Sequence, residues 1–93
     1  MIQVNEYFDG TVKSLGYESA AGRSTVGVME PGDYTFGTSQ HETVTVVEGE
    51  LAVLLPGQSD WQVFGVGQVF EVAANATFKV KVQVPTSYLC LYR

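Results

Sequence analysis

The stretch Thr43-Val44-Thr45-Val46-Val47-Glu48-Gly49-Glu50-Leu51-Ala52-Val53-Leu54-Leu55 decides the fold class of this chain. Valine and threonine dominate its first half, and β-branched side chains favour strands because they pack well on a pleated surface. The central Glu48-Gly49-Glu50 interrupts the apolar pattern, and glycine permits the tight turn that a hairpin needs. The stretch therefore predicts two short strands that are joined at Gly49.

The same kind of pattern extends along the rest of the chain. It is clearest at Phe78–Val82, where Lys79 and Lys81 point away from an apolar face. Gly and Pro recur so often that an ordinary helix would include one, at about 1 kcal/mol for glycine and about 3 kcal/mol for proline. We expect Gln68–Val84 to form two strands around a turn at 73–75. Other strands are expected at Val12–Leu15, Ser24–Met29, Tyr34–Thr38, Trp61–Phe64 and Ser87–Tyr92.

Nine or ten short strands at this spacing are typical of a β-barrel or an antiparallel β-sandwich of the jelly-roll kind. The 93 residues suffice for one small core, so we expect a single all-β domain over residues 1–93. In such a domain, functional side chains face inward or lie on the loops at one open end.

Composition excludes several classes of protein. Ten acidic residues against five basic ones give a net charge of −5, which argues against binding to the phosphate backbone of nucleic acid. Cys90 has no partner for an internal disulfide, as expected in a reducing cytoplasm. No apolar run reaches the roughly 18 residues of a membrane span, and the N-terminus lacks the features of a signal peptide. We expect a cytoplasmic protein that binds neither nucleic acid nor membranes.

Metal and nucleophile chemistry lack the residues that they need. A catalytic zinc or iron site takes three protein ligands, and His41 is the only histidine, so we expect no metal site and place His41 in a loop. A serine triad lacks its Gly-x-Ser-x-Gly elbow, and Cys90 lies in an apolar segment where thiols are usually inert. No metal or other cofactor is therefore expected.

The few basic residues offer one candidate site for an anion. Arg23 carries a planar fork that suits phosphate or carboxylate, and Ser24 adds a neighbouring hydroxyl donor. Lys13 lies in similar polar surroundings. The alternative for each cation is a solvated surface charge.

A second candidate site suits a sugar. Tyr34, Phe36, Thr38 and Glu42 share one face if the strand runs unbroken, and this face joins aromatic planes to polar groups. Trp61-Gln62 is a weaker case of the same kind. The alternative is that the aromatic residues belong to the core and that Glu42 lies in an exposed turn.

The segment Pro31–Leu51 resembles the first cupin motif, which contains a glycine, two metal-binding histidines, a glutamate and a further glycine. Glu42 and Gly49 match the last two elements, and Gly67–Phe78 is similar to the second motif. The two histidine positions of the first motif hold Phe36 and Thr38, or Thr38 and Gln40 when counted from Gly32. The histidine position of the second motif holds Phe78. The chain thus resembles a cupin without its metal ligands, and the resemblance implies a cupin-like β-barrel.

Blocks along the whole chain are similar, in the same order, to the small bacterial pyrimidine/purine nucleoside phosphorylases. These blocks are Asn5-Glu6-Tyr7-Phe8, Val12-Lys13-Ser14, Gly22-Arg23, Val26-Gly27-Val28-Met29, Leu54-Leu55-Pro56, Asp60-Trp61-Gln62-Val63 and Pro85-Thr86-Ser87-Tyr88-Leu89-Cys90. The resemblance implies phosphorolysis of many nucleosides to free base and ribose 1-phosphate. Nucleosides and inorganic phosphate would be its partners, and a homodimer is expected because cupins often pair through an edge strand.

Such a reaction should pass through an oxocarbenium-like ribosyl cation, by analogy with glycoside hydrolysis, and requires no metal. We expect Arg23 to bind phosphate, with Lys13 and Ser24 in support, and Glu42 to hold the ribose hydroxyls and favour the developing cation. Stacking accepts every base, and Gln62 or Tyr88 could donate to the leaving base. The candidate nucleoside-binding residues are Tyr7, Tyr34, Phe36, Thr38, Trp61, Gln62 and Tyr88.

Two other classes of function compete with this one. A non-enzymatic cupin would bind a small sugar or nucleotide tightly without turnover. A metal-dependent isomerase or dioxygenase would need metal ligands from a second subunit, because one chain has a single histidine.

Overall fold

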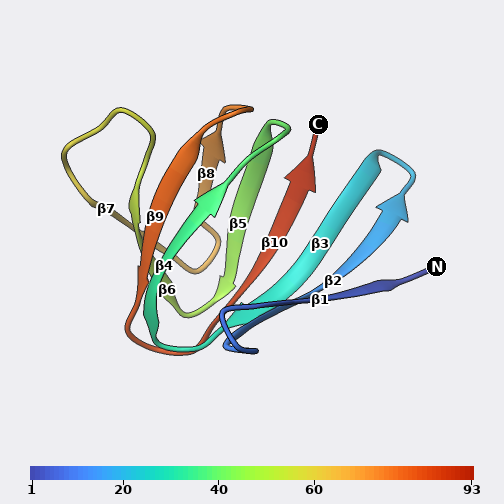
Figure 1. Ribbon diagram of the computed structural model, residues 1–93, viewed down its shortest axis with the longest axis horizontal. Helices are drawn as coiled ribbons and strands as arrows, with labels where there is room; N and C mark the ends of the chain where they lie inside the picture. The colour runs from blue at the N-terminus through green and yellow to red at the C-terminus, as the bar shows by residue number, and fades with distance from the viewer.

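The computed structural model describes residues 1–93, and all of its regular structure is β-strand (Figure 1). The strands are β1 (Gln3–Tyr7), β2 (Val12–Ser19), β3 (Gly22–Met29), β4 (Gly32–Gly37), β5 (Glu42–Glu48), β6 (Glu50–Leu54), β7 (Gln62–Gly65), β8 (Val69–Val72), β9 (Thr77–Val82) and β10 (Thr86–Tyr92). The predicted all-β fold is confirmed. The structure has no helix that could cross a membrane.

The strands form two antiparallel sheets. The larger sheet has six strands in the order β1-β2-β3-β10-β5-β8, and the smaller has four in the order β4-β9-β6-β7. In Figure 1 the smaller sheet lies toward the left, and β1 to β3 extend beyond it on the right. Strand pairing does not join the two sheets, so the architecture is a two-sheet sandwich, and closure into a barrel is not seen.

The two predicted turns are present and depend on left-handed backbone. Gly49 joins β5 to β6 with a φ of 98°, and a Cβ at this position would clash with Thr86 Oγ1. Asn75 has a φ of 57° in the turn between β8 and β9, a conformation that asparagine tolerates better than most residues. The turns therefore fall where the sequence predicts them, but neither closes a hairpin, because β5 and β8 belong to the larger sheet and β6 and β9 to the smaller one.

The core lies between the facing surfaces of the two sheets. Alternation in β9 buries Phe78, Val80 and Val82 and exposes both lysines, as predicted. The remaining buried apolar residues are Val12, Met29, Tyr34, Val44, Val46, Leu51, Val53, Phe70, Val72, Tyr88 and Cys90.

Candidate active site

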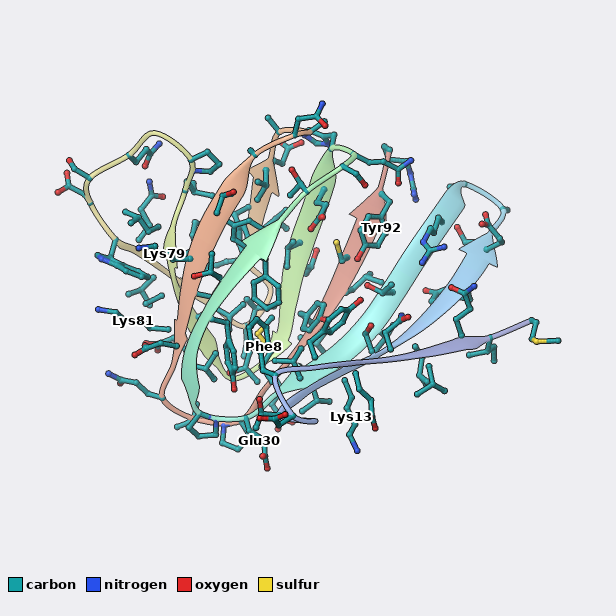
Figure 2. All side chains as sticks on the ribbon, viewed as in Figure 1. Phe8, Lys13, Glu30, Lys79, Lys81 and Tyr92 are labelled. Atoms are coloured by element: carbon teal, nitrogen blue, oxygen red, sulfur yellow. The ribbon has the colours of Figure 1, made fainter.

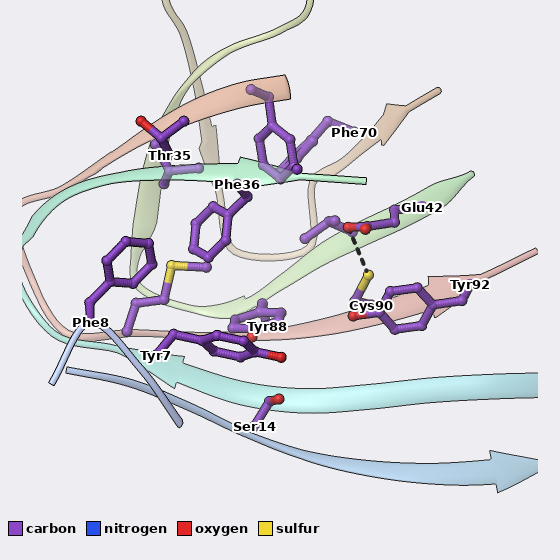
Figure 3. A pocket seen from close by; sticks show the side chains of 15 residues that line it. Tyr7, Phe8, Ser14, Thr35, Phe36, Glu42, Phe70, Tyr88, Cys90 and Tyr92 are labelled. Carbon is purple, nitrogen blue, oxygen red and sulfur yellow. Dashed lines mark hydrogen bonds between the residues drawn. The ribbon is translucent and has the colours of Figure 1, made fainter. Parts of the chain in front are cut away.

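A cavity of about 270 Å³ lies between the two sheets (Figure 3). Its size is close to the lower end of the roughly 300–1,000 Å³ that is usual for small-molecule sites. Most of the lining is apolar, with a few polar groups from the larger sheet. Such a lining suits one small ligand with an apolar ring and a polar part.

Glu42 is the one charged residue in the lining. It begins β5 and is half-buried, and its Oε1 accepts a hydrogen bond from Cys90 Sγ at 3.5 Å. Burial raises the pKa of Glu42 above 4.5, and the Cys90 hydrogen bond and His41 oppose this shift. The carboxylate retains lone pairs that can accept hydrogen bonds from a ligand.

Strand β10 supplies the polar wall of the cavity. Its alternation turns Tyr88, Cys90 and Tyr92 to the same side. Burial is the main cause that raises the pKa of Tyr88 to about 12 and that of Cys90 to about 12. Both groups therefore stay protonated near neutral pH and are hydrogen-bond donors there.

Gly27 allows the Tyr88 ring to lie flat against β3. A Cβ at this position would lie 2.5 Å from Tyr88 Oη, so any side chain there would displace the ring. Ser14 lines the cavity together with Tyr88, and its Oγ accepts a hydrogen bond from Asn5 Nδ2 at 3.2 Å. The close approach to Gly27 positions Tyr88 in the wall.

The opposite wall is aromatic and is completed by the turn after β1. Phe36 stacks on Phe78 with centroids 5.6 Å apart, and Phe8 meets Phe36 edge-on at 5.6 Å. Phe8 and Asp9 have φ values of 52° and 58°, which are uncommon for residues other than glycine. The turn thus brings Phe8 from the larger sheet onto β4 of the smaller sheet, 5.0 Å from the ring of Tyr34.

Four of the predicted site residues come together in this cavity: Tyr7, Phe36, Glu42 and Tyr88. The idea of one unbroken face from Tyr34 to Glu42 is wrong, because β4 ends at Gly37 and β5 begins at Glu42 in the other sheet. Phe36 and Glu42 therefore lie in opposite sheets, on the two sides of the cavity (Figure 3).

The structure separates the three residues that were expected to hold phosphate. Arg23 is exposed and does not line the cavity, but its Cζ lies 5.8 Å from the ring centroid of Tyr92, which does. Ser24 alternates with Thr25, whose hydroxyl lies 3.3 Å from Tyr92 Oη, so Ser24 faces the other side of the sheet. Lys13 also faces outward and lies 3.3 Å from Glu6.

Tyr34 and Thr38 lie outside the lining and have structural partners. Tyr34 is buried, and its hydroxyl donates to the carbonyl of Glu30 at 2.6 Å. The Thr38 hydroxyl donates to the carbonyl of Ala73 at 2.7 Å, which ties the end of β4 to the turn after β8. Both residues support the neighbouring walls without reaching the cavity.

Trp61 and Gln62 also lie away from the cavity, in and just before β7 of the smaller sheet. Trp61 is 38% exposed, and Lys81 Nζ lies 4.4 Å from its ring centroid. Gln62 Nε2 donates to Gln58 Oε1 at 3.0 Å. The structure does not bring this pair to the ligand site.

Sequence reasoning missed Phe8, Ser14, Cys90 and Tyr92 as lining residues. Two of them could have been predicted, because Cys90 and Tyr92 alternate with their neighbours in β10 and so face the same side as Tyr88, a predicted site residue. Phe8 carries no such signal, since its place depends on the conformation of the turn.

His41 lies in the loop before β5, as predicted, and its Nε2 is 3.2 Å from Glu71 Oε1. The structure contains no group of three or more histidine, cysteine, aspartate or glutamate side chains that could hold a metal ion.

The two antiparallel sheets around a ligand-sized cavity form a cupin-like fold. The fold is similar to that of an RmlC-like cupin from Shewanella frigidimarina, with a TM-score of 0.72, 15% identity, and coverage of 96% of this chain and 80% of that one. A crystal structure of a protein of unknown function from Vibrio parahaemolyticus is more similar, with a TM-score of 0.94, 46% identity, and coverage of 97% and 96%.

The sequence comparisons identify the family. Residues 2–92 match the family model of pyrimidine/purine nucleoside phosphorylase. A pyrimidine/purine nucleoside phosphorylase from Marinobacter nauticus is 59% identical over 92 residues, which is 99% of each chain. This chain therefore belongs to the pyrimidine/purine nucleoside phosphorylase family.

Proposed function

We propose that this protein catalyses the phosphorolysis of purine and pyrimidine nucleosides in the cavity between its sheets. Family membership supports the reaction, and the half-buried Glu42 opposite an aromatic wall supports the site. In the reaction the bond between ribose C1′ and the base nitrogen breaks, and a phosphate oxygen forms a new bond to C1′. The base leaves with the electron pair of the broken bond and takes up a proton.

Glu42 binds the ribose in this proposal. Its carboxylate accepts hydrogen bonds from the sugar hydroxyls, because the one donor it has in the protein is the weak thiol of Cys90. When the C1′–N bond lengthens, the negative charge of Glu42 stabilises the positive charge that develops on the ribose. An apolar surrounding strengthens this interaction, because water screens it less.

The aromatic wall holds the base. Phe36 in that wall and Tyr7 on β1 of the larger sheet offer faces on which purines and pyrimidines can stack, and stacking discriminates little between bases. The Tyr88 hydroxyl is protonated near neutral pH and donates a hydrogen bond to the leaving base. Broad substrate tolerance follows from a wall that contacts ring faces instead of base edges.

Arg23 binds phosphate at the side of the cavity where Tyr92 lies. The lining itself contains no cation, so the phosphate needs a charge from the rim, and Arg23 already contacts the Tyr92 ring. Its side chain is exposed and held by one 3.4 Å hydrogen bond to Gln3, so it can turn toward a bound phosphate.

We further propose that residues 1–93 form one domain with the complete site, that this domain works as a homodimer in the cytoplasm, and that it needs no metal. Bond exchange at C1′ involves no electron transfer, and a guanidinium can supply the charge that a metal would otherwise provide to phosphate.

The test is release of base from uridine and adenosine by the purified full chain. We expect release only when phosphate is added, with ribose 1-phosphate as the second product, and no change when EDTA is present. Release without phosphate would identify a hydrolase. Tight nucleoside binding without turnover would identify a binding protein, and loss of activity with EDTA would show that a metal takes part.

A further inference from the structure

The outer face of the six-stranded sheet is unusually apolar. Strand pairing aligns one residue from each strand into a continuous row across this face: Val4, Leu15, Val26, Leu89, Thr45 and Val69. None of these residues is charged. The exposed fractions of Val4, Leu15 and Val26 are 69%, 47% and 43%.

Neighbouring positions extend the row into a patch. Val28 and Tyr17 flank it on β3 and β2, and they are 51% and 38% exposed. The exposed apolar side chains of the row and of these two positions present on the order of 600 Å², the upper end for the largest patch of a monomer. Each partner of a standard stable complex contributes roughly 800 Å², so this patch accounts for most of an interface.

The outer face of the smaller sheet shows what a solvated face of this protein looks like. Its outward positions include Asp33, Thr35, Glu50, Lys79 and Lys81, which alternate with the core residues of β4, β6 and β9. Figure 2 shows Lys79 and Lys81 pointing away from the molecule on that side. Since both sheets belong to one sandwich, the contrast between the two outer faces points to a covered larger sheet.

The distribution of charge favours a protein as the partner of this face. The net charge of −5 opposes binding to anionic lipid or nucleic acid. On the apolar face itself, charged side chains lie only at the margins, where Lys13 pairs with Glu6 on β1 and β2, and Glu71 lies on the edge strand β8. An apolar centre with a polar rim is the usual anatomy of a protein interface.

We propose that the outer face of the six-stranded sheet binds the same face of a second copy of this chain, with Val26 and Leu15 near the centre. A patch that is apolar throughout is complementary to itself, as a two-fold symmetric contact requires. The edge strands of the two sheets, β1, β8, β4 and β7, have only four to six residues each and offer short ladders for pairing. The proposal deepens the proposed homodimer by naming its surface, and the cavity stays free because it lies on the opposite side of the sheet.

The experiment measures the mass of the full chain in solution by sedimentation velocity at about 10–100 µM, where a stable dimer of this size is populated. Val26→Glu and the milder Leu15→Gln alter the proposed interface. Val63→Glu is the matched control, because Val63 is 57% exposed on β7 of the other sheet and the added charge is the same. Circular dichroism checks that each variant is folded.

We expect wild type and Val63→Glu at twice the 10.1 kDa of one chain, Val26→Glu at the mass of one chain, and Leu15→Gln with dimer affinity lowered about tenfold or more. The proposed interface would be wrong if the wild type sedimented at the mass of one chain. It would also be wrong if a folded Val26→Glu stayed dimeric, or if Val63→Glu dissociated as well. Phosphorolysis is measured on the same samples. A dimer without activity would retract the proposed reaction alone, and an active single chain would retract the interface alone.

Discussion

The thiol of Cys90 on β10 donates a hydrogen bond to the carboxylate of Glu42 on the neighbouring strand β5, over 3.5 Å. The pair lies inside the cavity, where Glu42 has no other side-chain donor and Cys90 is 2% exposed. A thiol is a weak donor, so it orients the carboxylate without satisfying it. The arrangement leaves Glu42 partly desolvated and ready to accept stronger donors such as sugar hydroxyls.

Replacing Glu42 by glutamine tests its role in the reaction. Glutamine keeps the size and an acceptor oxygen but removes the negative charge that stabilises the ribosyl cation. We expect Glu42→Gln to lower kcat on the order of 100-fold. Glu71→Gln, on the edge strand, should keep wild-type kinetics, and equal activity of both variants would exclude the charge of Glu42 from the mechanism.

The same substitution should raise stability in a pH-dependent way. Because burial raises the pKa of Glu42 above 4.5, the folded state binds this proton more tightly than the unfolded chain does. This contribution to stability is fully present below the unfolded pKa and is lost as the pH rises through the folded pKa. Glu42→Gln should therefore melt above wild type at pH 7, with the difference shrinking as the pH falls toward 4. A difference of the same size at both pH values would contradict this account.

Arg23 should affect phosphate and leave nucleoside binding largely intact. We expect Arg23→Ala to raise the KM for phosphate about tenfold, because one charge-assisted contact is worth about 1.5–3 kcal/mol. Lys79→Ala removes the same charge from the far face and serves as the control. Initial rates against phosphate concentration give the result, and an unchanged KM in Arg23→Ala would remove Arg23 from the site.

Gly27 should be intolerant of even the smallest side chain. In Gly27→Ala the new Cβ would lie 2.5 Å from the position of Tyr88 Oη, so the ring must move or the strands must separate. We expect a loss of about 1–3 kcal/mol in the free energy of unfolding, measured with urea, together with lower activity. Gly65→Ala meets nothing nearer than 3.8 Å and should change stability by less than about 0.5 kcal/mol. Equal stability of both variants would show that Tyr88 is free to shift.

Cys90 should be unreactive in the folded protein. Burial raises its pKa to about 12, so the thiolate that attacks alkylating reagents is scarce at pH 8. We expect iodoacetamide to label Cys90 within minutes in urea and hardly at all in native buffer, as followed by mass spectrometry. Rapid labelling of the native protein would mean that the cavity wall opens readily.

Local pattern was sufficient for most of the fold. The alternation in β9 and the glycine of the β5–β6 turn act within a few residues, and both were predicted correctly. Strand β1 was missed because only one of its residues, Asn5, is even half-buried, so its place at the sheet edge leaves no apolar alternation.

The site was harder to predict, because it depends on which side of a strand a residue faces and on which sheet the strand joins. Arg23 and Ser24 are neighbours in sequence but point to opposite sides of β3. Phe36 and Glu42 face the same cavity from its two sides because β4 and β5 belong to different sheets. Tyr34 has the parity of Phe36 and still lies outside the cavity, since its hydroxyl is bound to the carbonyl of Glu30.

The left-handed turn that carries Phe8 has a consequence for the traffic of substrates and products. Its ring lines the rim from a hairpin whose outer strand, β1, is paired on one side only, yet it rests on the opposite sheet. An outward displacement of that hairpin would separate the ring from Phe36 and widen the entrance through which a base enters or leaves.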